Sequence, residues 1–238
     1  MSLFGWTMGG VYLVRYKDSP VGAFDELVVL AGLVWNAPTS CAWAQRVYVS
    51  SKTARNHGLQ SVGLPSRLAT FSQPSKPHAK AAKVSAHQAK QGSWWCGAAV
   101  KNGKTVAPGC AVVVQNVERG ARGLKAPVAE FLLPEALPRK GPRMPLTLPN
   151  FSGGTVDHPG LLHYTCKMLA NIRPAPAIRA VQSTGKDVAT VEDVSHVLKG
   201  KPLLCLEFRD LVMRVPEAQP WKPKVKRSSD VQVVTPLI

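Results

Sequence analysis

The sequence predicts an α+β fold made mainly of antiparallel β-strands. Three observations support this class: many short runs are rich in β-branched and aromatic residues, turn residues recur at close intervals between them, and only about two segments are typical of short helices. The chain has 238 residues and is 45% apolar, which is enough to bury the core of one domain.

The first third of the chain contains the clearest pattern. Strand candidates occupy residues 9–16, 25–35 and 43–49. The run 25–35 is apolar at both parities, which is typical of a strand buried on both faces. Ser51 is a suitable cap for a short helix through Gln60, with Gly58 near the end of that helix, and residues 63–65 (GLP) then interrupt the chain.

The remainder alternates between strand candidates and segments of low complexity. Further strands are predicted at 94–100, 110–117, 128–133, 144–151, 161–172 and 202–215. Residues 74–92 are mostly Ala, Lys, Pro, Ser and His, so they predict a basic loop insertion. Residues 217–238 are basic and proline-rich and predict a disordered tail. We therefore expect one domain over residues 1–216.

The net charge of +16 is unevenly distributed. Residues 28–116 contain ten Lys and Arg and neither Asp nor Glu. Such a field attracts nucleic acid, anionic lipid or acidic partners. The basic residues are not interleaved with aromatics as a stacking platform requires, so we favour a solvated loop and tail over a specific nucleic-acid site.

The compartment is only partly constrained by the sequence. Five cysteines form no CxxC pair, and their odd number argues against a disulfide framework and for a reducing compartment, which leaves cytoplasm and plastid open. The apolar runs are too short to span a bilayer, so we do not expect an integral membrane protein. The first eight residues lack the features of a secretory signal.

Metal and cofactor motifs are weak. Asp157, His158, His163 and Cys166 lie close together, but their spacing matches no standard zinc pattern. The chain has no GxGxxG, Walker A or GxSxG motif. We therefore expect neither a metal nor a cofactor.

Several segments are specific enough in sequence to resemble a known protein family. Those segments are residues 5–10 (GWTMGG), 15–27 (RYKDSPVGAFDEL), 35–44 (WNAPTSCAWA), 62–66 (VGLPS), 146–154 (LTLPNFSGG), 161–166 (LLHYTC) and 202–208 (PLLCLEF). Together they resemble the acetoacetate decarboxylase-like superfamily, and within it the plant neoxanthin-deficiency family. The resemblance covers roughly residues 4–73 and 141–215.

This resemblance implies a β-rich antiparallel barrel or cone with short helices at its sides. Because the superfamily's decarboxylases are oligomeric, it also implies a homo-oligomer. The resembling proteins have a further N-terminal stretch, so we interpret this chain as N-terminally truncated relative to them.

The resemblance also locates a ligand pocket, formed by Glu26, Pro65, Ser66 and Arg67. In the decarboxylases the positions of Ser66 and Arg67 are two adjacent lysines, one of which forms a Schiff base with the substrate. A serine hydroxyl forms no imine, and a guanidinium stays protonated. We therefore expect no Schiff-base decarboxylation unless another lysine, such as Lys52, reaches the site.

Glu26 matches the superfamily's pocket glutamate and is the candidate acid. Its neighbours at 27–30 are apolar, and a carboxyl in such surroundings has a raised pKa suited to proton donation near neutral pH. The alternative is a structural carboxylate paired with Arg67 or Arg46. We expect Glu26 and Arg67 to face one pocket, with Arg67 as the natural partner.

The resemblance leaves three functions open. The first is a factor required for neoxanthin biosynthesis, in the xanthophyll and abscisic acid pathway, that acts on or binds an epoxy-carotenoid or another apolar compound. The second is a non-enzymatic carrier or assembly partner that presents pigment. The third is a small-molecule lyase, hydratase or isomerase of the same fold that uses Glu26 as its acid.

Overall fold

The computed structural model describes residues 7–73, 110–118, 126–133, 141–175, 178, 180–181, 194–200 and 202–222. Its strands are β1 (Gly10–Tyr16), β2 (Phe24–Asn36), β3 (Thr39–Val49), β4 (Ser66–Ser72), β5 (Cys110–Asn116), β6 (Ala126–Leu133), β7 (Arg143–Gly153), β8 (Leu161–Pro174), β9 (Ala180–Val181), β10 (Leu206–Arg214) and β11 (Gln219–Pro220). Its helices are α1 (Lys52–Val62) and α3 (Ser195–Leu198).

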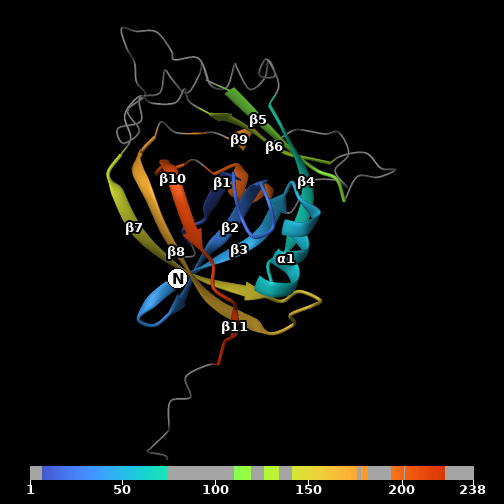
Figure 1. Ribbon diagram of the computed structural model, residues 1–238, viewed down its shortest axis with the longest axis vertical. Helices are drawn as coiled ribbons and strands as arrows, with labels where there is room; N and C mark the ends of the chain where they lie inside the picture. The colour runs from blue at the N-terminus through green and yellow to red at the C-terminus, as the bar shows by residue number, and fades with distance from the viewer. Residues whose placement is uncertain are drawn as a thin grey trace, which may run out of the picture.

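The strands form one mixed sheet in which β3 is the branch point. The order runs β10-β8-β7-β3-β4-β5-β6-β9, while β1 and β2 join through the β2–β3 pairing and β11 pairs with β8. The pairs β3–β4 and β3–β7 are parallel, and the others are antiparallel. The sheet curls into a cone-like shape, with α1 at its side (Figure 1). Over the described residues the path does not close on itself.

Over residues 27–33, strand β2 is covered on both faces, as its sequence predicts, whereas Val34 and Trp35 near its end are exposed. Leu27 and Val29 are fully buried in a cluster formed with β4, β5, β6 and α3. Val28 points the other way, into a second cluster with Val47 and Ala54. Since successive side chains of a strand face opposite sides, apolar residues at both parities serve two separate cores.

Helix α1 makes the crossover between the parallel strands β3 and β4, which a tight hairpin cannot join. Ser51 caps its start and accepts a hydrogen bond from the Ala54 N–H. The helix extends to Val62, beyond the predicted Gln60, because the residue that ends it is Gly63, with a left-handed φ of +66°. Gly58 lies inside the helix instead, where an added Cβ would be 2.4 Å from the Ser66 Oγ.

The predicted fold class is confirmed, and most predicted strands within the described residues are present. Strand β4 is the main omission, because residues 66–72 were not recognised as a strand. The predicted strand at 94–100 and the loop at 74–92 lie outside the described residues.

The predicted disordered tail requires a correction at its start. Residues 219–220 pair with β8 as β11, and the Trp221 N–H donates to the Leu161 carbonyl at 2.9 Å. The Trp221 ring also packs edge-on against Phe151, with 5.8 Å between centroids. Backbone pairing and an aromatic contact therefore order this segment despite its polar composition. Residues 223–238 lie outside the described part of the chain.

Among the described residues, none of the helices has the length and apolar character needed to cross a membrane.

Candidate functional site

Glu26 lies near the start of β2, and its side chain is on the same face of the sheet as the side chains of Tyr12, Val14 and Tyr16 on β1. The β1–β2 register pairs Glu26 with Val14, Val28 with Tyr12 and Phe24 with Tyr16. Directly paired residues share a face of a sheet, so the two tyrosines flank Glu26 on the neighbouring strand. The hairpin thus places two phenols beside one carboxyl group.

Tyr16 is the hydrogen-bond partner of Glu26. Its hydroxyl donates to the Glu26 Oε2 at 3.0 Å. Burial raises the pKa of Glu26 to about 7, although the bond from Tyr16 acts in the opposite direction. A carboxyl with this pKa exchanges its proton near neutral pH, as a general acid or base requires.

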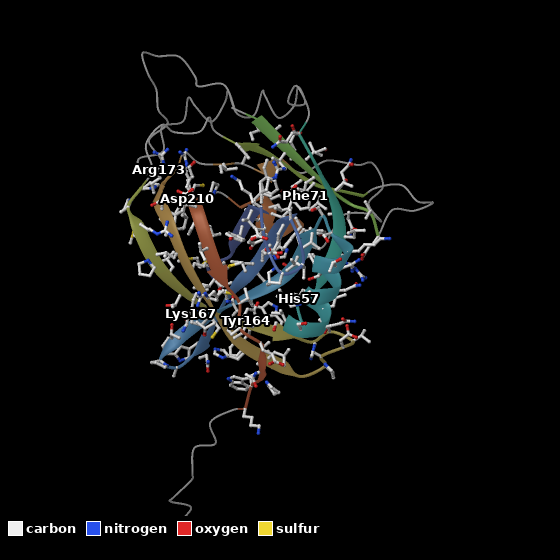
Figure 2. The ribbon with its side chains drawn as sticks, viewed as in Figure 1. His57, Phe71, Tyr164, Lys167, Arg173 and Asp210 are labelled. Carbon is white, nitrogen blue, oxygen red and sulfur yellow. The ribbon has the colours of Figure 1, made fainter. Side chains whose placement is uncertain are left out.

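Three further buried groups interact electrostatically with Glu26. Burial raises the pKa of Tyr12 to about 12, while a side-chain hydrogen bond with Tyr16 acts in the opposite direction and the Glu26 charge adds to the rise. Burial, assisted by Glu26, also raises the pKa of Cys166 to about 11 and that of Tyr164 well above its usual value. Tyr164 and Cys166 come from β8, far along the chain, and the label in Figure 2 locates Tyr164 near the lower end of the sheet.

We call Tyr12, Tyr16, Glu26, Tyr164 and Cys166 the carboxyl–phenol cluster. Burial and the members' own charges and hydrogen bonds account for the pKa shifts of all five groups, and no lysine, arginine or histidine of the described chain contributes. Tyr16 shares this behaviour, since burial and then Glu26 raise its pKa. At neutral pH the phenols and the thiol are therefore neutral donors around one titratable carboxyl.

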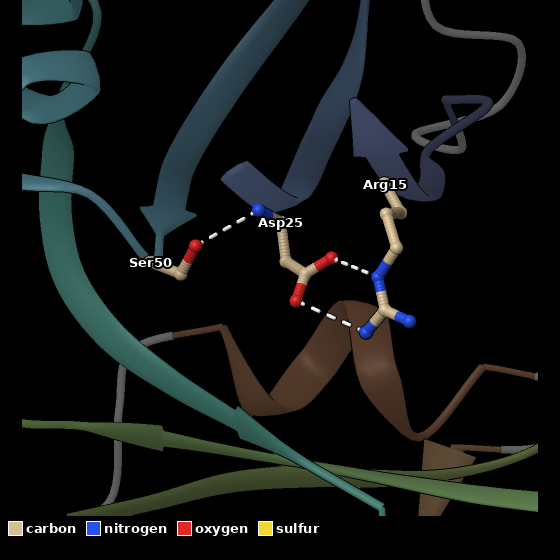
Figure 3. A network of polar contacts seen from close by, with 3 residues as sticks. All are labelled: Arg15, Asp25 and Ser50. Atoms are coloured by element: carbon tan, nitrogen blue, oxygen red, sulfur yellow. Dashed lines mark hydrogen bonds and ion pairs between the residues drawn. The ribbon is translucent and has the colours of Figure 1, made fainter. Parts of the chain in front are cut away.

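A polar clamp fixes the backbone next to Glu26 (Figure 3). The Arg15 guanidinium donates two hydrogen bonds to the Asp25 carboxylate, at 2.6 and 3.1 Å. The Asp25 N–H donates to the Ser50 Oγ at 2.8 Å, and the Ser50 N–H donates to the Asp25 carbonyl at 3.0 Å. Since these contacts join β1, β2 and the end of β3, they hold Glu26 in register with Tyr16.

Ser66 lies on the same side of the sheet as Glu26, and Pro65 directly precedes it. The register pairs Ser66 with Val47, which is paired with Val28 on the other side of β3. The usual strand spacings place the Cα atoms of Ser66 and Glu26 about 12 Å apart. The buried Ser66 side chain faces Gly58 of α1, and the Pro65 carbonyl accepts a hydrogen bond from the Val47 N–H.

Arg67 does not pair with Glu26, and this expectation was wrong. Arg67 is paired with Tyr48, which lies opposite Leu27 on the other face of the sheet. Arg46 is likewise paired with Val29 on that face. Alternation along the strands therefore separates both arginines from Glu26, whose partner is a neutral phenol. Glu26 is accordingly not the paired structural carboxylate of the alternative interpretation.

The residues considered as metal ligands have other contacts. The His158 Nε2 lies 2.6 Å from the Gln60 carbonyl at the end of α1. His163 packs edge-on against Phe151, and the Cys166 thiol accepts a hydrogen bond from Asn150 at 3.4 Å. Among the described residues, no three His, Cys, Asp or Glu side chains are grouped closely enough to hold a metal ion.

The fold and the cluster define a class: a mainly β protein that buries one titratable carboxyl among phenols and apolar side chains. No family model matches the sequence. The chain is 37% identical to Protein NEOXANTHIN-DEFICIENT 1 of Oryza sativa over 89% of this chain and 76% of that protein. It is 36% identical to the Solanum lycopersicum protein of the same name, over 89% and 79%. The chain belongs to the NEOXANTHIN-DEFICIENT 1 family.

Among solved structures, the chain is similar in fold to acetoacetate decarboxylase from Legionella pneumophila, with a TM-score of 0.46 and 12% identity over 89% of this chain and 73% of that one.

Proposed function

We propose that this protein is a factor required for neoxanthin biosynthesis, in the xanthophyll and abscisic acid pathway. In this proposal it binds an apolar, carotenoid-like small ligand inside the curled sheet, without Schiff-base decarboxylase chemistry. The observation that carries the proposal is its relation to the NEOXANTHIN-DEFICIENT 1 proteins, which covers nearly nine tenths of the chain.

The surroundings of the carboxyl–phenol cluster support an apolar ligand. Tyr164 and Cys166 belong to a cluster of apolar side chains whose other members are Val62, Leu64, Leu148, Met213 and Ala218. Leu64 also packs against the neighbouring core of Val47, Val49 and Ala54. An apolar lining with a few convergent polar groups is the usual composition of a small-molecule site.

Imine chemistry lacks support because the described lysines are all solvent-exposed. These residues are Lys17, Lys52, Lys167, Lys199 and Lys222. We predict that borohydride will trap no lysine adduct when the purified protein is incubated with acetoacetate, and that no carbon dioxide will be released. Mass spectrometry of the reduced protein provides the measurement, with a true acetoacetate decarboxylase as the positive control. A covalent adduct on any lysine would contradict this part of the proposal.

A second candidate is an isomerase, lyase or hydratase that uses Glu26 as its acid. The pKa of about 7 and the hydrogen bond from Tyr16 favour it. Opening an epoxide to an allene and an alcohol requires an acid at the epoxide oxygen and a base at carbon. Glu26 supplies a proton at the pH of the cell, and Tyr16 orients the carboxyl group.

Complementation tests the proposed function and separates its two forms. In a tomato line that lacks its own NEOXANTHIN-DEFICIENT 1 protein, we expect this chain to restore neoxanthin, measured by chromatography of leaf pigments. Failure of stably expressed protein to restore it would overturn the proposal. If Glu26 is the acid, we expect Glu26→Gln to slow the formation of neoxanthin about a hundredfold or more, so that the neoxanthin content of the leaves stays low. If the protein is a carrier, the variant restores the pigment.

A further inference from the structure

Three leucines on the segment that leads into β10 are exposed to solvent. The exposed fraction is 84% for Leu203, 66% for Leu204 and 41% for Leu206, and the first two are the most exposed leucines of the described chain. Apolar side chains scattered singly over a surface need no explanation, whereas a contiguous exposed patch marks an interaction site. We call Leu203, Leu204 and Leu206 the leucine patch.

The backbone of this segment is fixed at one end of the sheet. Leu206 is paired with Pro174, the last residue of β8, and the Ala175 N–H donates a hydrogen bond to the Cys205 carbonyl at 2.9 Å. In Figure 2 the label of Arg173, the residue before Pro174, marks this end of β8. The leucine patch therefore has a fixed position at this end of the sheet.

The strands beside the leucine patch carry two arginines that share one carboxylate. The Nε atoms of Arg173 and Arg209 donate to the two carboxylate oxygens of Glu207, at 2.7 and 2.9 Å. Glu207 directly follows Leu206 and is paired with Arg173. One carboxylate balances only one of the two guanidinium charges, so this part of the surface retains a positive charge.

Lysines extend the positive charge to the other side of the leucine patch. Lys199 is exposed and lies four residues before Leu203, and residues 194–206 contain two lysines and neither Asp nor Glu. One step further along the sheet, the charges of exposed Arg143 and exposed Asp210 offset each other, since both residues adjoin Asn171. The charge around the patch therefore favours an anionic partner.

An anionic lipid bilayer fits these features better than a protein does. A second copy of this chain carries the same positive charge and is repelled. A stable protein interface buries about 800 Å² on each partner, and three partly exposed leucines offer far less apolar area. A bilayer requires only that a few apolar side chains enter its interfacial region while neighbouring cations remain at the headgroups. Lysine and arginine side chains are long enough to reach headgroups from beside the leucines.

We propose that the leucine patch inserts into the surface of an anionic lipid bilayer, with Lys199 and the arginines of β8 and β10 at the headgroups. This inference goes beyond the proposed function and does not depend on it, because it is carried by exposed apolar side chains and by charge. The two proposals are compatible, since a carotenoid-like ligand dissolves in the apolar interior of the same bilayer.

Sedimentation of the purified chain with lipid vesicles measures its partition coefficient. We expect vesicles of phosphatidylcholine with about 30% phosphatidylserine to bind wild-type protein at least about tenfold more strongly than phosphatidylcholine alone. The double variant Leu203→Ser, Leu204→Ser should lower the partition coefficient on the phosphatidylserine vesicles at least about tenfold, because two leucine side chains no longer leave water. Both side chains are exposed in the folded protein, so thermal unfolding should be unchanged.

Val156→Ser is the matched control. Val156 is 99% exposed but lies in the turn between β7 and β8, at the opposite end of β8 from the leucine patch. We expect this variant to bind phosphatidylserine vesicles as wild-type protein does. The inference would be overturned by wild-type protein that binds neither vesicle, by equal losses in both variants, or by a double variant that retains its binding, since net charge alone would then attract the chain.

Sedimentation velocity without lipid tests the alternative occupant. We expect wild-type protein and the double variant to have the same oligomeric state. An oligomer of the wild-type chain that the double variant cannot form would assign the leucine patch to a contact between copies and would overturn the inference. Neither experiment alters the carboxyl–phenol cluster, so the proposed function is tested separately by complementation.

Discussion

Replacing Gly153 with alanine is expected to lower the free energy of unfolding by about 4 kcal/mol, the combined cost of backbone strain and overpacking. Gly153 ends β7 with a φ of +103°, a conformation that side chains rarely tolerate. A Cβ there would lie 2.1 Å from the Gly160 carbonyl oxygen, so the backbone of the turn must move. Urea unfolding followed by tryptophan fluorescence measures the loss.

Gly154→Ala is the matched control for this prediction. Gly154 also has a positive φ, at +66°, but an added Cβ there has no neighbour within 4 Å. We expect it to cost about 1 kcal/mol, the strain of a left-handed residue alone. The left-handed strain of about 1 kcal/mol is common to both variants. If Gly153→Ala costs no more than about 1 kcal/mol beyond Gly154→Ala, the turn backbone moves at little cost and the predicted clash is absent.

The consequences of Gly153→Ala extend beyond the turn. The Gly153 N–H donates to the Gly63 carbonyl at 2.9 Å, and Gly63 is the residue that ends α1. Ser152 also donates to the Val62 carbonyl, at 2.6 Å. Movement of Gly153 therefore loosens the helix that covers the core next to Glu26.

Strand alternation explains which part of the site could be predicted from the sequence. The apolar run 25–35 was correctly identified as buried on both faces over residues 27–33, because both parities are apolar, but the prediction failed at Val34 and Trp35, which are exposed. Strand β4 was missed, since residues 66–72 mix polar and apolar side chains without a clear period. Once β4 is known to be a strand, adjacent Ser66 and Arg67 must face opposite sides, and a pairing of Arg67 with Glu26 on the face of Ser66 is excluded.

The hydrogen-bond partner of Glu26, Tyr16, could have been predicted from the sequence. A hairpin around the predicted turn at 18–22 pairs Tyr16 with Phe24 and Val14 with Glu26, so Tyr16 lies diagonally across from the carboxyl. Tyr164 and Cys166 are different, because they reach the cluster from β8 through tertiary packing. Local pattern gives no signal for contacts of that sequence separation.

The stability of the protein is expected to depend on pH through Glu26. Burial raises its pKa from 4.5 to about 7, so the folded state holds the proton more tightly than the unfolded state. This contribution is fully present below about pH 4.5, and it is lost as pH rises through about 7. Between about pH 4 and pH 8, wild-type protein should lose on the order of 3 kcal/mol relative to Glu26→Gln, which has no carboxyl to ionise.

Urea unfolding of both proteins across this pH range measures the difference. The glutamine oxygen still accepts the hydrogen bond from Tyr16, so packing is largely preserved. Asp25→Asn is the neighbouring control: it weakens the bidentate pair with Arg15, whose side chain is 59% exposed, and should destabilise by at most about 1 kcal/mol. A variant that gains stability at about pH 8 and yet fails to restore neoxanthin would show that the carboxyl is retained for function at a cost in stability. A difference between wild type and Glu26→Gln that stays constant from about pH 4 to pH 8 would mean that native Glu26 titrates as it does in the unfolded chain, and the acid role would then lose its basis.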